Sequence, residues 1–205
     1  MDRRPLLIVD LDGPLLDVAS RYLAAHDQAL VASGARPRVH GLAAFWEAKR
    51  RSAPVAEGAD AGYAAAFKAC IERDDLLQLD RLQPGALAAL ARLAAQHPVE
   101  VLSLRTNVHG ARATIERLGI AAVAPVTFVP HNPAGKVERA RARVAARGVH
   151  AVLAVIGDTE ADAAVAEALA APFWAVSCGI RTVERLRGFG AARVEDSLAA
   201  YASAP

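Results

Sequence analysis

Two groups of carboxylates each follow a short apolar run. Asp10-Leu11-Asp12-Gly13 comes directly after Leu6-Leu7-Ile8-Val9, and Asp158-Thr159-Glu160-Ala161-Asp162 comes just after the apolar run 152–156. Carboxylates at positions i and i+2 of an extended segment emerge on the same side. Acids are also common in the first turn of a helix, so the second group alone could be a helix start. Two such groups at the ends of apolar runs favour a common site.

Carboxylates that converge in one place repel one another unless a cation joins them. Oxygen ligands of this kind suit Mg²⁺, which usually keeps several waters and accepts oxygens of a substrate phosphate. We therefore expect Mg²⁺ as the cofactor, bound among Asp10, Asp12, Asp158 and Asp162.

Five continuous apolar runs predict buried strands of a parallel sheet, because such strands do not alternate with polar residues. They span residues 6–9, 99–104, 126–129, 152–156 and 173–176. Helical patterns separate the later runs, over 85–96, 110–118, 136–147 and 160–171. Strands that alternate with helices predict an α/β fold with a Rossmann-like open parallel sheet of about five strands. Sites in such folds lie at the carboxyl ends of the strands, where both acidic groups would be.

The segment between the first and second predicted strands is too long for an ordinary connection. It has helical patterns over 15–33, 41–51 and 60–74 and no convincing strand. We expect a core domain made of residues 1–14 and 84–205, with residues 15–83 inserted after the first strand as a small, all-helical cap domain.

The composition excludes several classes of protein. A hydrophobic content of 54% provides ample material for a core, and a net charge of +2 does not favour a nucleic-acid or membrane partner. No apolar run approaches the roughly 18 residues that a membrane span needs. Cys70 and Cys178 lie far apart, and no secretory leader is apparent, which favours a reduced, cytoplasmic protein.

The chain resembles the haloacid dehalogenase-like hydrolase superfamily, in its phosphoglycolate phosphatase-like branch with an inserted helical cap. Asp10-Leu11-Asp12-Gly13 matches the first motif of that family, and Gly157-Asp158-Thr159-Glu160-Ala161-Asp162 matches the fourth. Pro84-Gly85 is similar to the point where such chains leave the cap. The resemblance covers nearly the whole chain and implies a phosphatase that acts on a small phosphorylated metabolite.

The resemblance also implies roles for the acids. Asp10 would attack phosphorus and form an aspartyl-phosphate. Asp12 would protonate the leaving oxygen and then activate water. Mg²⁺ would be held by Asp10, the backbone carbonyl of Asp12 and Asp158, while Asp162 would orient a metal-bound water or a lysine.

Two further motifs follow from the resemblance. A Ser or Thr at the end of the second strand, with a neighbouring N–H such as that of Leu104, would hold the phosphate. The Thr106-Asn107 pair matches the residues that are common at this motif in the family, whereas the number of residues after Pro84 favours Ser103. The lysine that neutralises the phosphate and the nucleophile would be Lys136.

One position departs from the family pattern, since Pro14 stands where a Thr usually follows the glycine, and it removes a hydroxyl and an N–H. In the cap, Trp46 and Lys49 could form a lip over the substrate, although Trp46 could equally be a core residue of the cap. Alternatives to a phosphatase are a phosphosugar mutase of the same fold and a catalytically silent protein that binds a phosphate ligand. The oligomeric state is not readable from the sequence.

Overall fold

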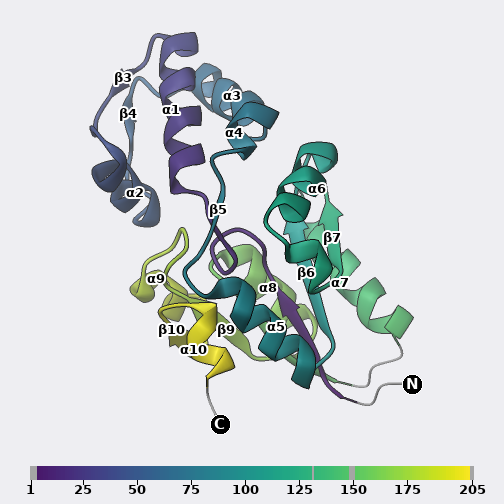
Figure 1. Ribbon diagram of the computed structural model, residues 1–205. Helices are drawn as coiled ribbons and strands as arrows, with labels where there is room; N and C mark the ends of the chain where they lie inside the picture. Colours follow the sequence, from purple (N-terminus) through teal and green to yellow (C-terminus); the bar gives the residue numbers. More distant parts are fainter. Residues whose placement is uncertain (1–3, 131, 148–150, 204–205) are drawn as a thin grey trace.

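The computed structural model describes residues 4–130, 132–147 and 151–203. The outer ends of the expected core domain, residues 1–3 and 204–205, lie outside the described residues. Figure 1 shows a sheet with helices on both faces in the lower part of the view and a helical unit above it. The chain crosses from one unit to the other twice.

The core is a parallel six-stranded sheet in the order β10-β9-β8-β1-β6-β7. Its strands are β10 (Arg193–Glu195), β9 (Phe173–Val176), β8 (Val152–Gly157), β1 (Leu6–Val9), β6 (Val99–Leu104) and β7 (Val126–Val129). The prediction of a Rossmann-like parallel sheet is confirmed, and all five predicted strands are present. The sixth, β10, was missed because this edge strand is short, half-buried and bounded by Arg193 and Glu195, so it has no apolar run.

Both faces of the sheet are covered, which explains why its inner strands are mainly apolar; the buried Glu100 in β6 is paired with Arg143 and Arg147. In β1, Leu7 and Val9 pack into one hydrophobic cluster while Leu6 and Ile8 pack into the other. The first cluster includes residues of α5 (Ala86–Gln96), α6 (Val108–Arg117) and α10 (Leu198–Ala202). The second includes residues of α7 (Pro133–Arg147), α8 (Glu160–Ala168) and α9 (Val183–Gly188). A 3₁₀ turn, η1 (Ile120–Ala122), follows α6.

The inserted segment contains α1 (Ala19–Ser33), α2 (Leu42–Arg50), α3 (Ala61–Cys70) and α4 (Asp74–Leu77). It is not entirely helical, because the two-residue strands β3 (Arg36–Pro37) and β4 (Ala56–Glu57) pair with each other. Phe45 is fully buried and stacks on His26, with ring centroids 4.8 Å apart. This segment therefore has a small core of its own, which supports our proposal that residues 15–83 form a cap domain.

The two crossings pair with each other as short antiparallel strands. These are β2 (Leu16–Asp17) and β5 (Arg81–Leu82), in which Leu16 lies opposite Leu82. The pair lies between the two units in Figure 1 and joins the insertion to the sheet end of β1. It is the natural place for a hinge, because the chain passes between the sheet and the insertion through these two strands.

Within the described ranges, no helix is both long and apolar enough to cross a membrane. Cys70 and Cys178 are both free, half-buried thiols.

Candidate active site

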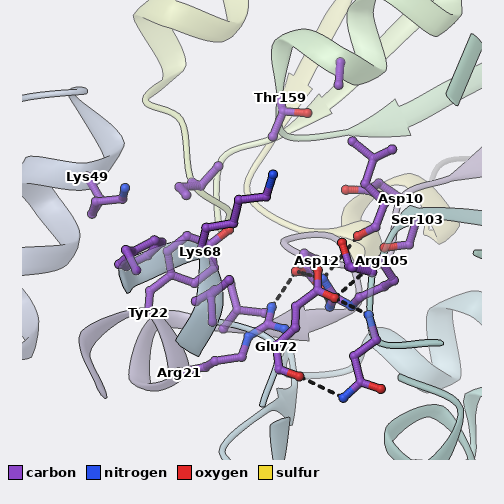
Figure 2. A pocket seen from close by; sticks show the side chains of 18 of the residues that line it. Asp10, Asp12, Arg21, Tyr22, Lys49, Lys68, Glu72, Ser103, Arg105 and Thr159 are labelled. Atoms are coloured by element: carbon purple, nitrogen blue, oxygen red, sulfur yellow. Dashed lines mark hydrogen bonds and ion pairs between the residues drawn. The ribbon is translucent and has the colours of Figure 1, made fainter. Parts of the chain in front are cut away.

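A cavity of about 910 Å³ lies between the insertion and the carboxyl ends of the sheet strands. Its floor carries Asp10 and Asp12 from the loop after β1, Ser103 at the end of β6, and Asp158 from the loop after β8. These strands are neighbours in the sheet, so residues more than 140 positions apart in the sequence meet at one edge. Figure 2 shows side chains of the insertion facing this floor from the opposite side.

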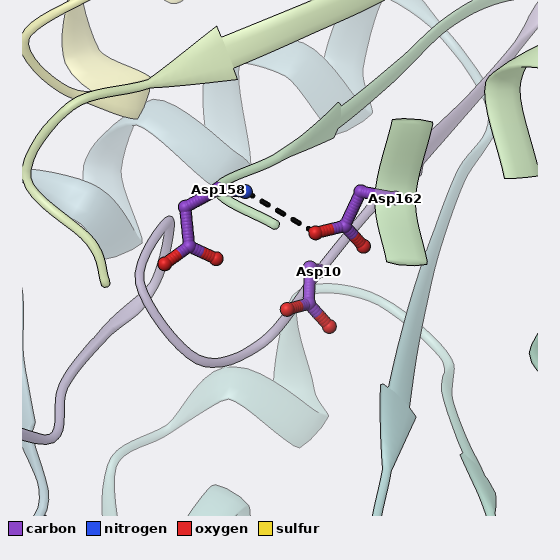
Figure 3. A group of neighbouring side chains, drawn as sticks. All are labelled: Asp10, Asp158 and Asp162. Atoms are coloured by element: carbon purple, nitrogen blue, oxygen red, sulfur yellow. Dashed lines mark hydrogen bonds between the residues drawn. The ribbon is translucent and has the colours of Figure 1, made fainter. Parts of the chain in front are cut away.

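Three buried carboxylates gather at the floor of the cavity, which Asp10 and Asp158 line, with Asp162 next to them (Figure 3). Asp10, Asp158 and Asp162 each offer an oxygen, and these oxygens lie within 4.8 Å of one another. The three side chains are at most 9% exposed. The carboxylate of Asp12 is not part of this group, because it is hydrogen-bonded to Arg21 and Arg105.

The donor set fits a hard divalent cation. Oδ2 of Asp158 accepts the N–H of Ile180 at 2.5 Å, whereas its buried Oδ1 has no hydrogen-bond partner among the described residues. A buried carboxylate oxygen without a partner is costly, and a cation would satisfy it. The backbone at Gly13 and Gly179 lies so close to Asp158 that a Cβ at either position would collide with its carboxylate. The three acids therefore form a candidate metal site.

Asp162 is engaged by protein donors. Its Oδ1 accepts from Nζ of Lys136 at 2.6 Å, and its Oδ2 accepts from the hydroxyl of Thr159 at 2.7 Å and from the Thr159 N–H at 3.0 Å. Together with Thr159 it forms a capping box at the start of α8. Asp162 is thus placed to orient Lys136 and the loop that carries Asp158.

Lys136 connects two of the acids. Its Nζ lies 2.8 Å from Oδ1 of Asp10 as well as 2.6 Å from Asp162, and the side chain is only 3% exposed. Burial opposes the charge of this ammonium, but the carboxylates of Asp10 and Asp162 outweigh burial and raise its pKa. Lys136 is therefore a fixed positive charge beside Asp10.

The same surroundings disfavour ionisation of the acids. Burial, helped by the nearby charges of Asp162 and Asp12, outweighs Lys136 and raises the pKa of Asp10 to about 7. Burial and the neighbouring carboxylates of Asp10 and Asp162 raise the pKa of Asp158 well above its ordinary value. A bound cation would reverse this balance, because it favours the charged forms.

Asp12 is held in a different environment, between two guanidinium groups. Its Oδ2 accepts from Arg21 at 2.5 Å and from Arg105 at 2.8 Å, and its Oδ1 accepts a second bond from Arg105. Arg21 also pairs with the buried Asp80 at 3.1 Å. Burial favours the protonated form of Asp12, but Arg105 and then Arg21 hold its pKa well below the usual range. In this arrangement Asp12 is ionised and has no proton to donate.

The two candidates for the phosphate-binding hydroxyl both line the cavity, as does Leu104. Ser103 is 2% exposed and lies beside Asp10 (Figure 2). Thr106 is exposed, and its N–H donates to Glu72 of the insertion at 2.6 Å. The geometry thus favours Ser103, which lies beside Asp10, over the exposed Thr106.

Of the two predicted lip residues, the structure brings one to the cavity. Lys49 lines it, whereas Trp46 is not among its lining residues. Trp46 packs edge-on against Tyr22, with ring centroids 5.7 Å apart, and lies against the hydrophobic clusters. This arrangement corresponds to the alternative stated for Trp46, a core residue of the cap.

Sequence reasoning missed Arg21, Arg105, Lys68 and Glu72, all of which line the cavity. A signal existed for Arg21, because it shares an otherwise apolar helix face with Ala25 and Ala29. Arg105 had a weaker signal, its position directly after the strand that ends with Ser103 and Leu104. Its pairing with Asp12, 93 residues away, could not be read from spacing.

The chain is similar to known proteins in sequence and in fold. No family model matches the chain. A phosphoglycolate phosphatase from Mesorhizobium japonicum is 31% identical over 198 residues, which cover 86% of this chain and 84% of that protein. A haloacid dehalogenase-like family hydrolase from Streptococcus pneumoniae has a similar structure, with a TM-score of 0.73 at 14% identity over 98% of both chains. A HAD family hydrolase from Deinococcus radiodurans, solved with phosphate and sodium, gives a TM-score of 0.65 at 18% identity, over 98% of this chain and 94% of that one.

Proposed function

Because the chain belongs to the haloacid dehalogenase-like hydrolase superfamily, we propose that it is a Mg²⁺-dependent phosphatase that hydrolyses a small phosphorylated metabolite through an aspartyl-phosphate on Asp10. The class of enzyme, a hydrolase of phosphate monoesters, agrees with the named relatives. The observation that carries the proposal is the buried group of three carboxylates with Lys136 between two of them.

In the first step, an Oδ of Asp10 attacks phosphorus and the ester P–O bond breaks, so that the alcohol leaves and the phosphoryl group stays on Asp10. Lys136 neutralises the negative charge of Asp10 and of the phosphoryl oxygens. Ser103 and the N–H of Leu104 are the proposed donors to those oxygens. The phosphate in the relative from Deinococcus radiodurans supports a phosphate site in this fold.

In the second step, water attacks phosphorus and Asp12 accepts its proton, which releases phosphate and restores Asp10. The two guanidiniums keep Asp12 ionised, but they occupy both of its oxygens and make it a weak base, so this role needs at least one of them to withdraw. To donate a proton to the leaving oxygen in the first step, Asp12 must first leave at least one guanidinium. Arg21 belongs to α1 of the cap, so a movement of the cap about the β2–β5 pair would withdraw it.

The proposed ligands of Mg²⁺ are Asp10, Asp158 and the backbone carbonyl of Asp12, with Asp162 orienting Lys136. When bound, the cation supplies positive charge for the phosphate oxygens and keeps the acids ionised. Without it, the raised pKa of Asp10 leaves part of the nucleophile protonated at neutral pH.

Turnover of p-nitrophenyl phosphate tests the proposal. We expect hydrolysis with added Mg²⁺, loss of activity with EDTA and recovery after Mg²⁺ is restored. Asp10→Asn should reduce turnover to background, while Asp196→Asn, an exposed acid outside the cavity lining, should leave it unchanged. Undiminished hydrolysis in EDTA would refute the metal requirement. Binding of phosphate without any turnover would favour the silent binding protein.

A further inference from the structure

Asp80 is a buried carboxylate that the mechanism above does not use. It directly precedes β5, where the chain returns from the insertion to the core, and its side chain is 0% exposed. Arg117 of α6 donates to the backbone carbonyls of Asp80 and Leu77, so the core holds this position in place. Among the described residues, neither oxygen of the Asp80 carboxylate has a hydrogen-bond partner. A buried acid in this state is costly, because nothing replaces its hydration.

The cation in contact with Asp80 is Arg21 of α1, whose Nε lies 3.1 Å from Oδ1. This contact does not compensate for burial. Burial outweighs the charge of Arg21, the charge of Asp12 adds to the effect of burial, and the pKa of Asp80 is raised to about 7. Asp80 therefore lacks positive charge in this arrangement.

The guanidinium of Arg21 is divided between two acids. Its Nε lies against Asp80, while its Nη2 donates to Oδ2 of Asp12 at 2.5 Å (Figure 2). Nε and Nη2 form the edge of a guanidinium that can bind one carboxylate through two parallel hydrogen bonds. Other arginines of this chain use that edge on a single acid, namely Arg73 on Asp75, Arg143 on Glu100 and Arg181 on Glu160. Arg21 would reach the same arrangement on Asp80 by releasing Asp12.

Release of Asp12 would open its carboxylate to the substrate. Oδ2 of Asp12 now accepts from both Arg21 and Arg105. Departure of Arg21 leaves one acceptor position of Oδ2 open, while Arg105 still orients the carboxylate. The leaving oxygen, and later the attacking water, can then reach Asp12.

We propose that Asp80 is a positioning residue, which accepts the guanidinium of Arg21 when it leaves Asp12 and thereby allows Asp12 to act on the leaving oxygen. This inference rests on the proposed phosphatase function. Asp80 is not among the residues that line the cavity, so it acts through Arg21. Its carboxylate gives the displaced guanidinium a partner, and Arg21 does not have to remain buried as an unpaired charge.

The position of Arg21 tests this exchange without any turnover. Asp12→Asn removes the charge that competes with Asp80 and keeps the shape of the side chain. A crystal structure of this variant should show Nε and Nη2 of Arg21 both hydrogen-bonded to Asp80. An Arg21 side chain that stays at position 12, or turns into the cavity, would overturn the inference whether or not the protein hydrolyses phosphate esters.

Leaving groups of different basicity test the consequence for catalysis. p-Nitrophenyl phosphate releases a weakly basic anion that needs little protonation, whereas phenyl phosphate has a similar shape and releases a more basic anion. The ratio of kcat/KM for phenyl phosphate to that for p-nitrophenyl phosphate therefore reports proton delivery by Asp12. Asp80→Asn leaves Arg21 with Asp12 as its carboxylate partner and should lower this ratio by about tenfold, the effect of one charge-assisted hydrogen bond. Equal losses for both substrates would indicate a merely structural role and would overturn the inference.

Glu100→Gln is a matched control for the loss of a buried charge. Glu100 is 1% exposed, pairs with Arg143 and Arg147 of α7 and lies outside the cavity lining, so this change should leave the ratio unchanged. In an Arg21→Met background, Asp80→Asn should no longer change the ratio, because the exchanged guanidinium is absent.

The two measurements separate this inference from the proposed function. Absence of turnover with both esters, together with Arg21 on Asp80 in the Asp12→Asn crystal, would count against the proposed function alone. If Asp80→Asn does not fold, the Asp12→Asn crystal still decides, because that variant retains Asp80.

Discussion

Replacing Asp158 by Asn removes one charge from the carboxylate group and leaves its shape. The side chain is 2% exposed, and an Asn oxygen can still accept the N–H of Ile180 that Oδ2 accepts now. The change therefore tests electrostatics with little disturbance of packing. We expect opposite effects on the metal-free and the metal-bound protein.

The magnitude follows from the geometry. Oxygens of Asp10, Asp158 and Asp162 lie within 4.8 Å of one another. Two full charges at that distance repel by about 3.5 kcal/mol at an effective dielectric constant of about 20. The raised pKa of Asp158 means that partial protonation already relieves some of this repulsion. We expect Asp158→Asn to raise the free energy of unfolding of the metal-free protein by about 1–2 kcal/mol at pH 7.5, a fraction of that repulsion.

Metal should reverse the order of stability. Mg²⁺ at about 100 times its dissociation constant adds about 2.7 kcal/mol to the free energy of unfolding of a protein that binds it only when folded. The wild type should gain about this amount, whereas Asp158→Asn, which lacks a proposed ligand, should gain much less.

Urea unfolding followed by tryptophan fluorescence measures both effects, in EDTA and in Mg²⁺, for the wild type, Asp158→Asn and the surface control Asp196→Asn. A variant less stable than the wild type in EDTA would contradict the like-charge argument. Equal stabilisation of both proteins by Mg²⁺ would show that the cation binds elsewhere.

Three shorter predictions address pH, backbone contact and the clamp on Asp12. Because the pKa of Asp10 is raised to about 7, the folded metal-free protein holds a proton that the unfolded chain has lost above about pH 4, so its stability should fall as pH rises from 5 to 7. Saturating Mg²⁺ should flatten this slope in urea unfolding, and an identical slope with and without metal would contradict the assignment. Gly179→Ala places a Cβ against the carboxylate of Asp158 and should weaken Mg²⁺ binding by about 10–100-fold in calorimetry, while Gly188→Ala, in open space, should not. Arg105→Met removes the two hydrogen bonds from Arg105 to Asp12 and should lower the free energy of unfolding by about 2–3 kcal/mol. An unchanged urea midpoint would show that Arg105 does not stabilise the fold through Asp12.

Much of the fold could be predicted from the sequence, because the inner strands are buried on both faces and therefore read as mainly apolar runs. β1 is such a strand, whereas β10 lies at an edge between charged residues and has no such signal. The two-residue strands β3 and β4 are likewise too short to leave a pattern.

The candidate site was only partly predictable, and the reason is topological. Asp10 and Asp158 follow strands that are neighbours in the sheet, so strand ends alone bring them together. The pairing of Arg105 with Asp12 joins the loops after two neighbouring strands, and the position of Lys68 and Arg21 at the cavity depends on how the cap lies over the core. No local spacing encodes that arrangement, and only the three-dimensional structure reveals it.

The central claim is that Asp10 becomes phosphorylated during turnover, and locating the phosphoryl group tests it most directly. Asp12→Asn should slow hydrolysis of the intermediate, because it removes the general base, whose contribution is typically about 10²–10⁴-fold. Acid quench of this variant during turnover of p-nitrophenyl phosphate, followed by peptide mass spectrometry, should find an added phosphoryl group on Asp10 that is absent from the Asp10→Asn protein. A phosphoryl group on any other residue, or turnover that persists in Asp10→Asn, would contradict the account.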